Sequence, residues 1–344
     1  MDVHDFEYEL PPEAIAQAPA LERDAARLLL IDRARGALED HVVRELPELL
    51  RPGDCVVVND SRVIPARVLA LDASGHRVEL LFAEPQRDGR WRALVRPGRR
   101  CRAGARLVVP GAVEACLRIV AAEPEGPRIV ERLDGTIDDL LASHGMLPLP
   151  PYIARHAQPT ADDRERYQTV YARSPGSVAA PTAGLHFTPS LLDRLRARSI
   201  EVHALTLHVG PATFRPIKSE RVEDHILAAE RVAIPASVAD AVNSARNEGR
   251  RVVAVGTTTT RALESAAGAD GRVRAHDGTA EAYITPGYRF RVVDALVTNF
   301  HLPRSSLLVL VCALAGRELI LKAYQHALRA GYRFYSYGDA TLIV

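Results

Sequence analysis

Four histidines stand in sharply patterned segments and could exchange protons near neutral pH. Their segments are Ala-Gly-Leu-His-Phe, Leu-His-Val-Gly, Glu-Asp-His-Ile and Asn-Phe-His-Leu-Pro, and the residues are His186, His208, His225 and His301. The ordinary pKa of histidine lies close to neutrality, so these residues are candidates for acid–base catalysis. For any one of them alone, a hydrogen-bonded structural role at a strand end is the better interpretation. No pair has the compact spacing of a recognised metal site, so we expect no metal.

Small residues surround His186. Residues 179–188 read Ala-Ala-Pro-Thr-Ala-Gly-Leu-His-Phe-Thr and include Thr182 and Gly184. Few packing roles need such a string, and small residues would permit close approach of the backbone to a nucleoside. Further polar candidates stand in other patterned segments, each with a salt-bridge or capping role as an alternative of comparable weight: Arg261, Glu264, Asp294, Asn299 and Asp339.

A threonine-rich turn at residues 256–261 is a candidate anion site. Gly-Thr-Thr-Thr-Thr-Arg follows a strand pattern at residues 251–255, and we expect it to lead into a helix at Arg261. Backbone N–H groups and the helix dipole would favour a carboxylate or a phosphate there, with Thr257 and Thr258 as contacts. Threonine caps without any ligand would explain the same pattern.

Arginines gather in residues 86–107, which contain eight of them and a single acidic residue, Asp88. Arginine forks match phosphate oxygens, so the cluster is a candidate contact for a nucleic-acid backbone. We select Arg99, Arg100 and Arg102 as these contacts. A solvated face of a β-structure is an alternative of equal weight.

The composition excludes several classes of protein. The sequence has 44 Lys and Arg against 43 Asp and Glu, so its net charge is too small to attract nucleic acid by itself. A nucleic-acid partner must therefore bind a local patch of positive charge. The four cysteines lie far apart and the sequence has no glycine-rich dinucleotide or P-loop motif, which disfavours dinucleotide, P-loop and radical-cluster enzymes. Residues 307–315 form the longest apolar run, which is too short for a bilayer, and residues 1–5 carry no basic, apolar leader. We therefore expect a cytoplasmic protein without membrane contact.

Local patterns divide the 344 residues into two domains. Residues 28–31 and 38–43 predict a hairpin, residues 11–16 a short helix, and residues 55–58 a buried strand that runs into polar residues 59–62. Short β-rich runs at residues 78–82, 91–95, 106–109 and 115–120 then predict a small all-β barrel or sandwich. From residue 150, helices and strands alternate, with a helix that starts after Thr188, a strand at 200–209 and a helix at 236–248. We predict a mixed α/β domain of residues 1–62 plus 150–344, with residues 63–149 as an inserted barrel-like domain.

Three segments together carry a family resemblance. They are residues 179–188, residues 294–316, which read Asp-Ala-Leu-Val-Thr-Asn-Phe-His-Leu-Pro and continue in an apolar run, and the terminal Tyr-Arg-Phe-Tyr-Ser-Tyr-Gly-Asp at residues 332–339. Nearly the whole chain resembles the S-adenosylmethionine:tRNA ribosyltransferase-isomerase family of queuosine biosynthesis. The resemblance implies transfer and isomerisation of the ribosyl group of S-adenosylmethionine onto 7-aminomethyl-7-deazaguanine at the tRNA wobble position, with release of adenine and methionine.

The resemblance also implies partners and site residues. S-adenosyl-L-methionine is then a co-substrate, and we expect no tightly bound cofactor. We expect the protein to bind the anticodon loop of the tRNA and to be a monomer. We expect catalytic roles for His186, His301, His208 and Asp294. The substrate contacts we expect are Thr182, Gly184, Gly210, Thr257, Thr258, Arg261, Asn299, Tyr337 and Asp339.

Several positions depart from the family pattern, among them Ala212, Ala228, Tyr283, Thr285 and Thr341. Ala212 stands where the family has a glycine, and Ala228 stands where it has a histidine two residues before Glu230. A glycine at the first position would serve a positive φ that alanine resists. A diverged paralogue that modifies another base, or a protein that only binds RNA, is therefore the alternative hypothesis.

Overall fold

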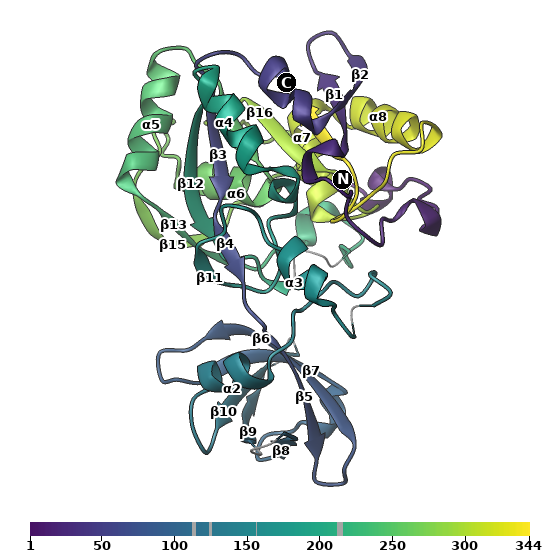
Figure 1. The fold of residues 1–344 in the computed structure, drawn as a ribbon, viewed down its shortest axis with the longest axis vertical. Helices are drawn as coiled ribbons and strands as arrows, with labels where there is room; N and C mark the ends of the chain where they lie inside the picture. The colour runs from purple at the N-terminus through teal and green to yellow at the C-terminus, as the bar shows by residue number, and fades with distance from the viewer. Residues whose placement is uncertain (112–114, 124–125, 156, 212–215) are drawn as a thin grey trace.

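The chain folds into two lobes. The computed structural model describes residues 1–111, 115–123, 126–155, 157–211 and 216–344. One lobe is built on a large mixed sheet and the other is a closed β-barrel, and Figure 1 shows the barrel below the sheet. This confirms the predicted mixed α/β fold with an inserted barrel.

The larger lobe contains a nine-stranded sheet in the order β15-β13-β12-β3-β14-β16-β17-β1-β2. Its central strands β12, β3, β14 and β16 are parallel, and antiparallel pairs flank them. The strands are β1 (Arg27–Asp32), β2 (Ala37–Val42), β3 (Cys55–Asn59), β12 (Glu201–Leu207), β13 (Glu230–Ile234), β14 (Val252–Val255), β15 (His276–Ala280), β16 (Ala295–Asn299) and β17 (Ala340–Ile343). The hairpin of β1 and β2 and the buried strand β3 confirm their sequence predictions.

Helices cover both faces of this sheet, which explains the continuous apolar run of β3. Cys55 and Val57 belong to the core on one face, and Val56 and Val58 to the core on the other. The first core includes residues of α5 (Ala236–Asn247), α6 (Thr257–Ala266), α7 (Ser306–Ala315) and α8 (Arg317–Arg329). The second includes residues of α1 (Leu46–Leu49) and α4 (Pro189–Ala197). Short 3-10 helices are η1 (Val3–Phe6), η2 (Pro12–Ala14), η3 (Arg23–Ala25), η4 (Val43–Glu45), η5 (Gly98–Arg100), η6 (Thr182–His186) and η8 (Val222–Asp224).

The barrel closes in the order β10-β7-β6-β5-β8-β9, with every pair antiparallel. Its strands are β5 (Arg67–Asp72), β6 (Arg77–Pro85), β7 (Trp91–Arg96), β8 (Arg106–Val109), β9 (Ala115–Ala122) and β10 (Arg128–Arg132). Alternate residues of β6, namely Val78, Leu80 and Phe82, are fully buried in the barrel core. Helix α2 (Ile137–His144) adds Ile137, Leu140 and Leu141 to this core.

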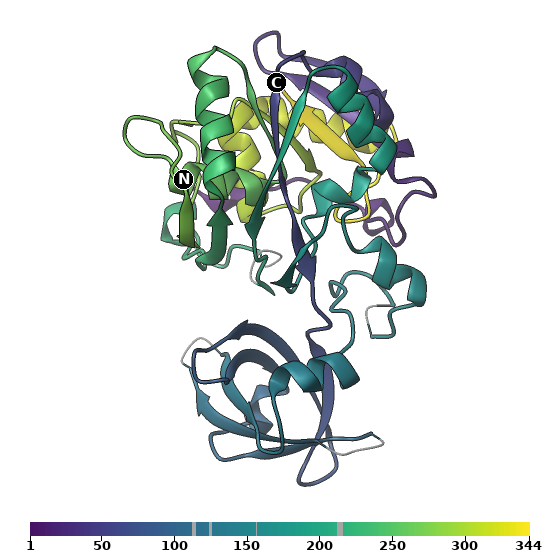
Figure 2. The same cartoon turned by 60° about the vertical axis from the view of Figure 1, so that its left-hand side comes forward.

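Two segments of chain connect the lobes, as Figure 2 shows from a second side. On the way into the barrel, β4 (Ser61–Val63) pairs in parallel with β11 (Ser174–Ser177). On the way out, the chain passes through α3 (Ala161–Arg166). A small core near this junction joins Val63, Leu149, Tyr167 and Tyr337. The domain boundaries at residues 63 and 149 stay a prediction.

Two local predictions were wrong. Helix α6 begins at Thr257, not at Arg261, so the threonines form its first turn. Thr259 and Thr260 donate their hydroxyls back to the carbonyls of Val255 and Gly256, which lets threonine fit a helix that sequence propensity disfavours. The helix expected at residues 11–16 is only the 3-10 turn η2.

The part of the chain that the structure describes contains no helix long and apolar enough to cross a membrane.

Candidate active site

The central parallel strands end together, and Asn59 joins them at that edge. Its side-chain nitrogen donates to the carbonyl of Leu207 over 2.9 Å and lies 3.5 Å from the hydroxyl of Thr258. Its side-chain oxygen accepts from the backbone nitrogen of Leu207 over 3.0 Å. β12 pairs with one side of β3 and β14 with the other, so the chain adds strands to the sheet on opposite sides of β3. Such a topological switch point, at the carboxyl ends of the strands, is the usual ligand-binding region of an open α/β sheet.

A cavity of about 1360 Å³ borders this region and the barrel. Residues from both lobes line it, so neither lobe alone could enclose a ligand there. The larger lobe contributes His208, Gly210, Ala228 and Glu230, and the barrel contributes Arg87, Trp91 and Arg92. We call this cavity the interlobe cleft.

His208 presents a neutral imidazole at the interlobe cleft. Its ring packs against Gly176, where a Cβ would lie 2.7 Å from Nδ1 and where φ is +142°. Nδ1 is buried and has no hydrogen-bond partner among the described residues. Burial lowers the pKa of His208, nearby Arg231 lowers it further, and Asp60 partly opposes the shift. An unprotonated imidazole that borders the cleft can accept a proton.

Gly210 is held in the cleft wall by a buried ion pair. Its backbone nitrogen donates to Oε1 of Glu230 over 3.0 Å, and Oε2 of Glu230 pairs with Nη1 of Arg261. Arg261 also donates from Nε to the carbonyl of Ala282 over 3.1 Å. Arg261 and Glu230 are 3% and 6% exposed. The guanidinium predicted to bind substrate is therefore engaged in holding the wall.

Thr257 and Thr258 are buried at the start of α6, on the same sheet edge. Thr258 lies beside Asn59. The structure therefore places both predicted threonine contacts, Thr257 and Thr258, at the switch point.

His186 lies on η6 in a hydrogen-bonded chain with two other predicted residues. Thr182 donates its hydroxyl to Oδ1 of Asn299 over 2.9 Å, which leaves Nδ2 of Asn299 to donate to Nε2 of His186 over 3.1 Å. Burial lowers the pKa of His186 to about 4, while the carboxylate of Asp339 acts in the opposite direction. His186 is thus neutral at physiological pH, with Nε2 already accepting a bond.

His301 lies in a separate, buried environment. Its Nε2 lies 3.1 Å from the hydroxyl of Thr298, and its backbone nitrogen donates to the hydroxyl of Tyr324 over 3.0 Å. Tyr8 donates to its carbonyl. Burial lowers the pKa of His301 to about 3. His225, the fourth histidine, packs edge-on against the ring of Tyr283.

The missing side chain of Gly184 makes room for another residue of the protein. A Cβ on Gly184 would lie 2.1 Å from the hydroxyl of Tyr171 and 2.9 Å from Cγ2 of Thr169. The space at Gly184 is thus filled by Tyr171, and the predicted contact of Gly184 with a nucleoside stays a prediction.

Asp294 lies at the opposite end of the sheet from Asn299, because it precedes β16 and Asn299 ends it. Its carboxylate accepts from the backbone nitrogen of Val252 over 2.8 Å, and its carbonyl accepts from Arg33. The structure does not bring Asp294 to the other predicted catalytic residues.

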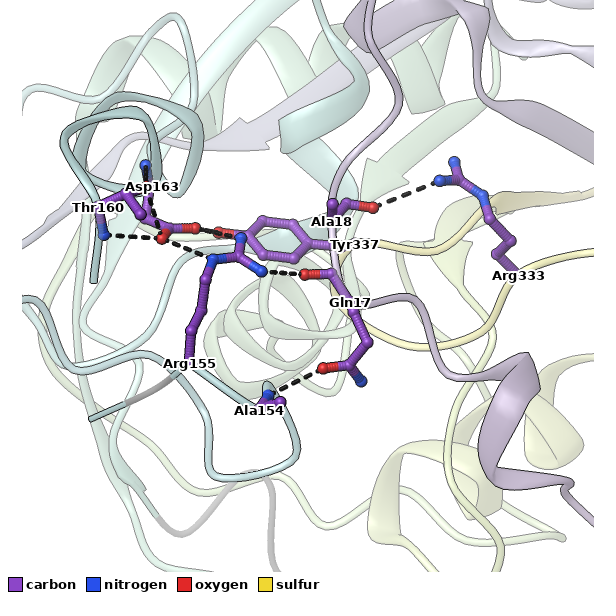
Figure 3. Close-up of polar contacts among 8 residues, drawn as sticks. All are labelled: Gln17, Ala18, Ala154, Arg155, Thr160, Asp163, Arg333 and Tyr337. Carbon is purple, nitrogen blue, oxygen red and sulfur yellow. Dashed lines mark hydrogen bonds and ion pairs between the residues drawn. The ribbon is translucent and has the colours of Figure 1, made fainter. Parts of the chain in front are cut away.

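Tyr337 and Asp339 are buried near His186. Tyr337 donates to Asp163 over 3.3 Å, and Figure 3 shows this contact within a larger polar network. The two oxygens of Asp339 accept from the backbone nitrogens of Arg27 and Arg333 over 3.1 and 2.8 Å. Asp339 thereby joins the terminal segment to the first residue of β1.

The three selected arginines of the barrel lie away from the interlobe cleft. The hairpin between β6 and β7 lines the cleft, whereas Arg99, Arg100 and Arg102 follow the far end of β7. At about 3.3 Å per residue, β7 separates its two ends by about 17 Å. Arg99 and Arg102 are exposed, and Arg100 pairs with Asp72 over 3.0 Å.

One group of possible metal ligands occurs among the described residues. Cys55, Glu201 and His203 come together near the amino ends of β3 and β12, away from the cleft. Burial raises the pKa of the Cys55 thiol to about 12, and Arg250 lies 3.4 Å from Glu201. A protonated thiol beside a guanidinium is a poor cation site.

Comparisons with known proteins identify the family. A family model described as queuosine biosynthesis protein matches residues 3–343. The chain is 51% identical to an S-adenosylmethionine:tRNA ribosyltransferase-isomerase of Moorella thermoacetica and 49% identical to one of Geobacter metallireducens, in each case across all of both chains. The chain belongs to this family. It also resembles the crystal structure of an S-adenosylmethionine tRNA ribosyltransferase from Thermotoga maritima, with 36% identity, a TM-score of 0.57, and coverage of 99% of this chain and all of that one.

The structure describes Ala228, one of the positions that depart from the family pattern. Ala228 is exposed on the wall of the interlobe cleft, and its carbonyl lies 3.5 Å from Nη2 of Arg261. Ala212 lies outside the described residues.

The sequence did not predict the residues whose side chains join different strands and helices at the site. Asn59 was visible only as a polar residue after a buried strand, and its contacts with β12 and α6 depend on the sheet order. The pairing of Glu230 with Arg261, which are 31 positions apart, carries no local sequence signal.

Proposed function

We infer that this chain is an S-adenosylmethionine:tRNA ribosyltransferase-isomerase of queuosine biosynthesis. The family membership across residues 3–343 carries this inference. The interlobe cleft supports it, because it combines a proton acceptor, a switch-point edge and a wall from a second lobe.

We propose that the tRNA presents 7-aminomethyl-7-deazaguanine to the interlobe cleft. An unpaired wobble base can be splayed out of the anticodon loop into a pocket. Arg87 is exposed on the barrel wall and suited to contact a phosphate of the surrounding nucleotides, whereas Arg92 pairs with Glu84 and Glu123 and Trp91 is buried in the barrel core. The residues 63–149 then act as a tRNA-holding domain on the catalytic domain of residues 1–62 and 150–344.

The reaction needs proton transfers that neutral imidazoles can perform. The aminomethyl group must lose a proton before it attacks the ribosyl unit. The sulfonium acidifies the adjacent C5′ hydrogens, and loss of one of them starts the rearrangement to the epoxycyclopentanediol as methionine and adenine depart. We propose His208 as one proton acceptor, because its ring borders the cleft and its pKa is lowered by burial. Proton transfer by His186 or His301 stays a prediction.

Asn299, Thr182 and the Glu230–Arg261 pair are proposed to position these groups. The chain from Thr182 through Asn299 fixes the His186 ring, and Glu230 fixes the backbone of Gly210 in the cleft wall. We propose a monomer that acts in the cytoplasm, where tRNA is available, with no tightly bound cofactor.

The test is product analysis. Purified protein with S-adenosylmethionine and tRNA that carries the aminomethyl-deazaguanine should release adenine and methionine in equal amounts, with a chelator present throughout. Release of S-adenosylhomocysteine would show methyl transfer and overturn the assignment. Tight tRNA binding without any release of adenine would support the alternative, a paralogue that only binds RNA.

A further inference from the structure

Arg23 and Arg166 lie side by side near His186, and neither forms an ion pair with a described residue. Arg23 donates to the carbonyls of Leu185 and Glu165 over 3.0 and 3.1 Å. Arg166 donates to the carbonyls of Leu21 and Ala20. Burial and the neighbouring Arg166 lower the pKa of Arg23, and the carboxylates of Glu165 and Asp162 partly oppose this shift. Carbonyl oxygens do not neutralise this charge.

These arginines and His186 line the same small cavity. It measures about 10 Å³, which is room for one oxygen-sized group. Its lining includes Arg23, Arg166, His186 and Tyr337. Nε of Arg166 is buried and has no hydrogen-bond partner among the described residues. The site therefore offers positive charge and an unused donor around a space that one oxygen would fill.

The network of Figure 3 holds both arginines in place. Asp163 stands three residues before Arg166, and it is 1% exposed. It pairs with Arg155, accepts from Thr160 and accepts from the hydroxyl of Tyr337. This ties the short helix α3 to Tyr337, which lines the cavity.

The same network ties down the segment that carries Arg23. Arg155 donates to the carbonyl of Gln17, whose side chain accepts from the backbone nitrogen of Ala154 over 2.8 Å. Arg333 donates to the carbonyl of Ala18 over 3.3 Å. Arg155 and Arg333 thus anchor the segment that precedes Arg23. The positions of the two guanidinium groups are therefore fixed in the absence of a ligand.

We propose that Arg23 and Arg166 bind the carboxylate of the methionyl group of S-adenosylmethionine. The proposal rests on the proposed function. Guanidinium groups match carboxylates, and the cavity has room for one oxygen of such a group. Arg261, the arginine expected from the sequence to bind an anion, is occupied by Glu230.

The test compares two ligands that differ in the carboxylate alone. S-adenosylmethionine and decarboxylated S-adenosylmethionine are titrated by equilibrium dialysis in the presence of saturating unmodified tRNA. Wild-type protein should bind the first more tightly. Arg166→Gln should weaken binding of S-adenosylmethionine about 10- to 100-fold and leave binding of the decarboxylated ligand within about twofold, because a charge-assisted hydrogen bond is lost only where the carboxylate is present. Arg166→Lys should restore part of the difference.

Arg164→Gln is the matched control, because Arg164 is exposed on the same helix. It should leave the affinities for both ligands unchanged. If Arg166→Gln melts at a lower temperature than wild type, Arg23→Gln replaces it and should give the same selective loss.

Equal weakening of both ligands by either variant would overturn the proposal and leave these arginines a structural role. A loss of tRNA affinity with unchanged binding of S-adenosylmethionine would also overturn it, in favour of a phosphate contact. If wild-type protein turns over S-adenosylmethionine but does not distinguish the two ligands, the proposal fails while the proposed function stands. Absence of turnover would instead contradict the proposed function itself.

Discussion

Nδ2 of Asn299 donates to Nε2 of His186 over 3.1 Å, and this bond determines which nitrogen of the imidazole carries the proton. The orientation of the amide is fixed by Thr182, which donates to Oδ1 of Asn299. His186 therefore uses Nε2 as an acceptor, and its proton belongs on Nδ1. A residue so engaged is suited to position its surroundings, whereas His208 borders the cleft with a nitrogen that has no partner among the described residues.

The first prediction separates the histidines by their pH profiles. His208→Gln should lower kcat/KM about 100-fold, because a general base is lost. The lowered pKa of His208 means that wild-type kcat/KM should fall only when the pH drops below the ordinary histidine value, and that this acid limb should vanish in the variant. The measurement is kcat/KM for S-adenosylmethionine from pH 5 to 9.

His186→Gln and His301→Gln provide the comparison. If these residues transfer protons, each variant should slow the reaction by about 100-fold or more. Their pKa values of about 4 and about 3 lie below the measured range, so the acid limb seen in wild type should persist in both variants. An unchanged rate and an unchanged acid limb in His208→Gln would remove His208 from the mechanism.

The second prediction concerns where tRNA contacts the barrel. Replacement of Arg99, Arg100 and Arg102 by Ala should weaken tRNA binding and reduce the log–log salt slope by about 0.7 to 0.9 per lost phosphate contact. Arg87→Ala with Arg92→Ala at the cleft end is the matched comparison. Filter binding over a range of salt concentrations measures both. An unchanged affinity and slope in the triple variant would show that the far end of β7 is only a solvated face.

The third prediction concerns Ala228 on the cleft wall. If its departure from the family histidine is neutral, Ala228→His should change turnover by no more than a few-fold. The short alanine leaves the cleft open, and its carbonyl contact with Arg261 does not depend on the side chain. A rise in turnover of about 100-fold, or about 2.7 kcal/mol of barrier, would mark the chain as a degraded or repurposed member of the family.

The fourth prediction is a loss of stability in acid. Burial lowers the pKa of His186 to about 4 and of His301 to about 3, so the unfolded chain binds protons that the folded chain does not as the pH falls below about 6.5. Each histidine should therefore reduce the free energy of unfolding by up to about 1.4 kcal/mol per pH unit down to its folded pKa. Urea unfolding from pH 7.5 to pH 4.5 measures the slope.

His301→Gln should flatten this slope, because the titrating group is removed. Tyr324→Phe is the control: it removes the bond to the backbone of His301 and should lower stability at every pH while the slope persists. A slope that is the same in wild type and His301→Gln would show that His301 does not titrate on unfolding.

Much of the architecture could be predicted because burial leaves a local pattern. The apolar run that ends at Asn59 predicted a central strand, and alternation in Val78, Leu80 and Phe82 predicted a barrel strand. The start of α6 could not be predicted, because threonine hydroxyls that bond to their own helix override a weak propensity.

The site was less predictable for a related reason. Thr182 and Asn299 were both recognised as candidates, yet their contact spans 117 positions and depends on η6 lying against β16. Asp294 looked equivalent to Asn299 in the sequence, but the five residues of β16 place the two near opposite ends of a strand. The sequence pattern of a strand does not indicate which of its two ends lies at the binding site.

Isotopic labelling tests the central claim most directly. Two samples of S-adenosylmethionine are used, one labelled in the ribosyl carbons and one in the methyl group, each with tRNA that carries 7-aminomethyl-7-deazaguanine. Mass spectrometry of the digested tRNA should find the ribosyl label in the modified base as an epoxycyclopentanediol, and the methyl label in free methionine. Methyl label in the tRNA, or no label transfer from either sample by protein that melts cooperatively, would contradict ribosyl transfer by this chain.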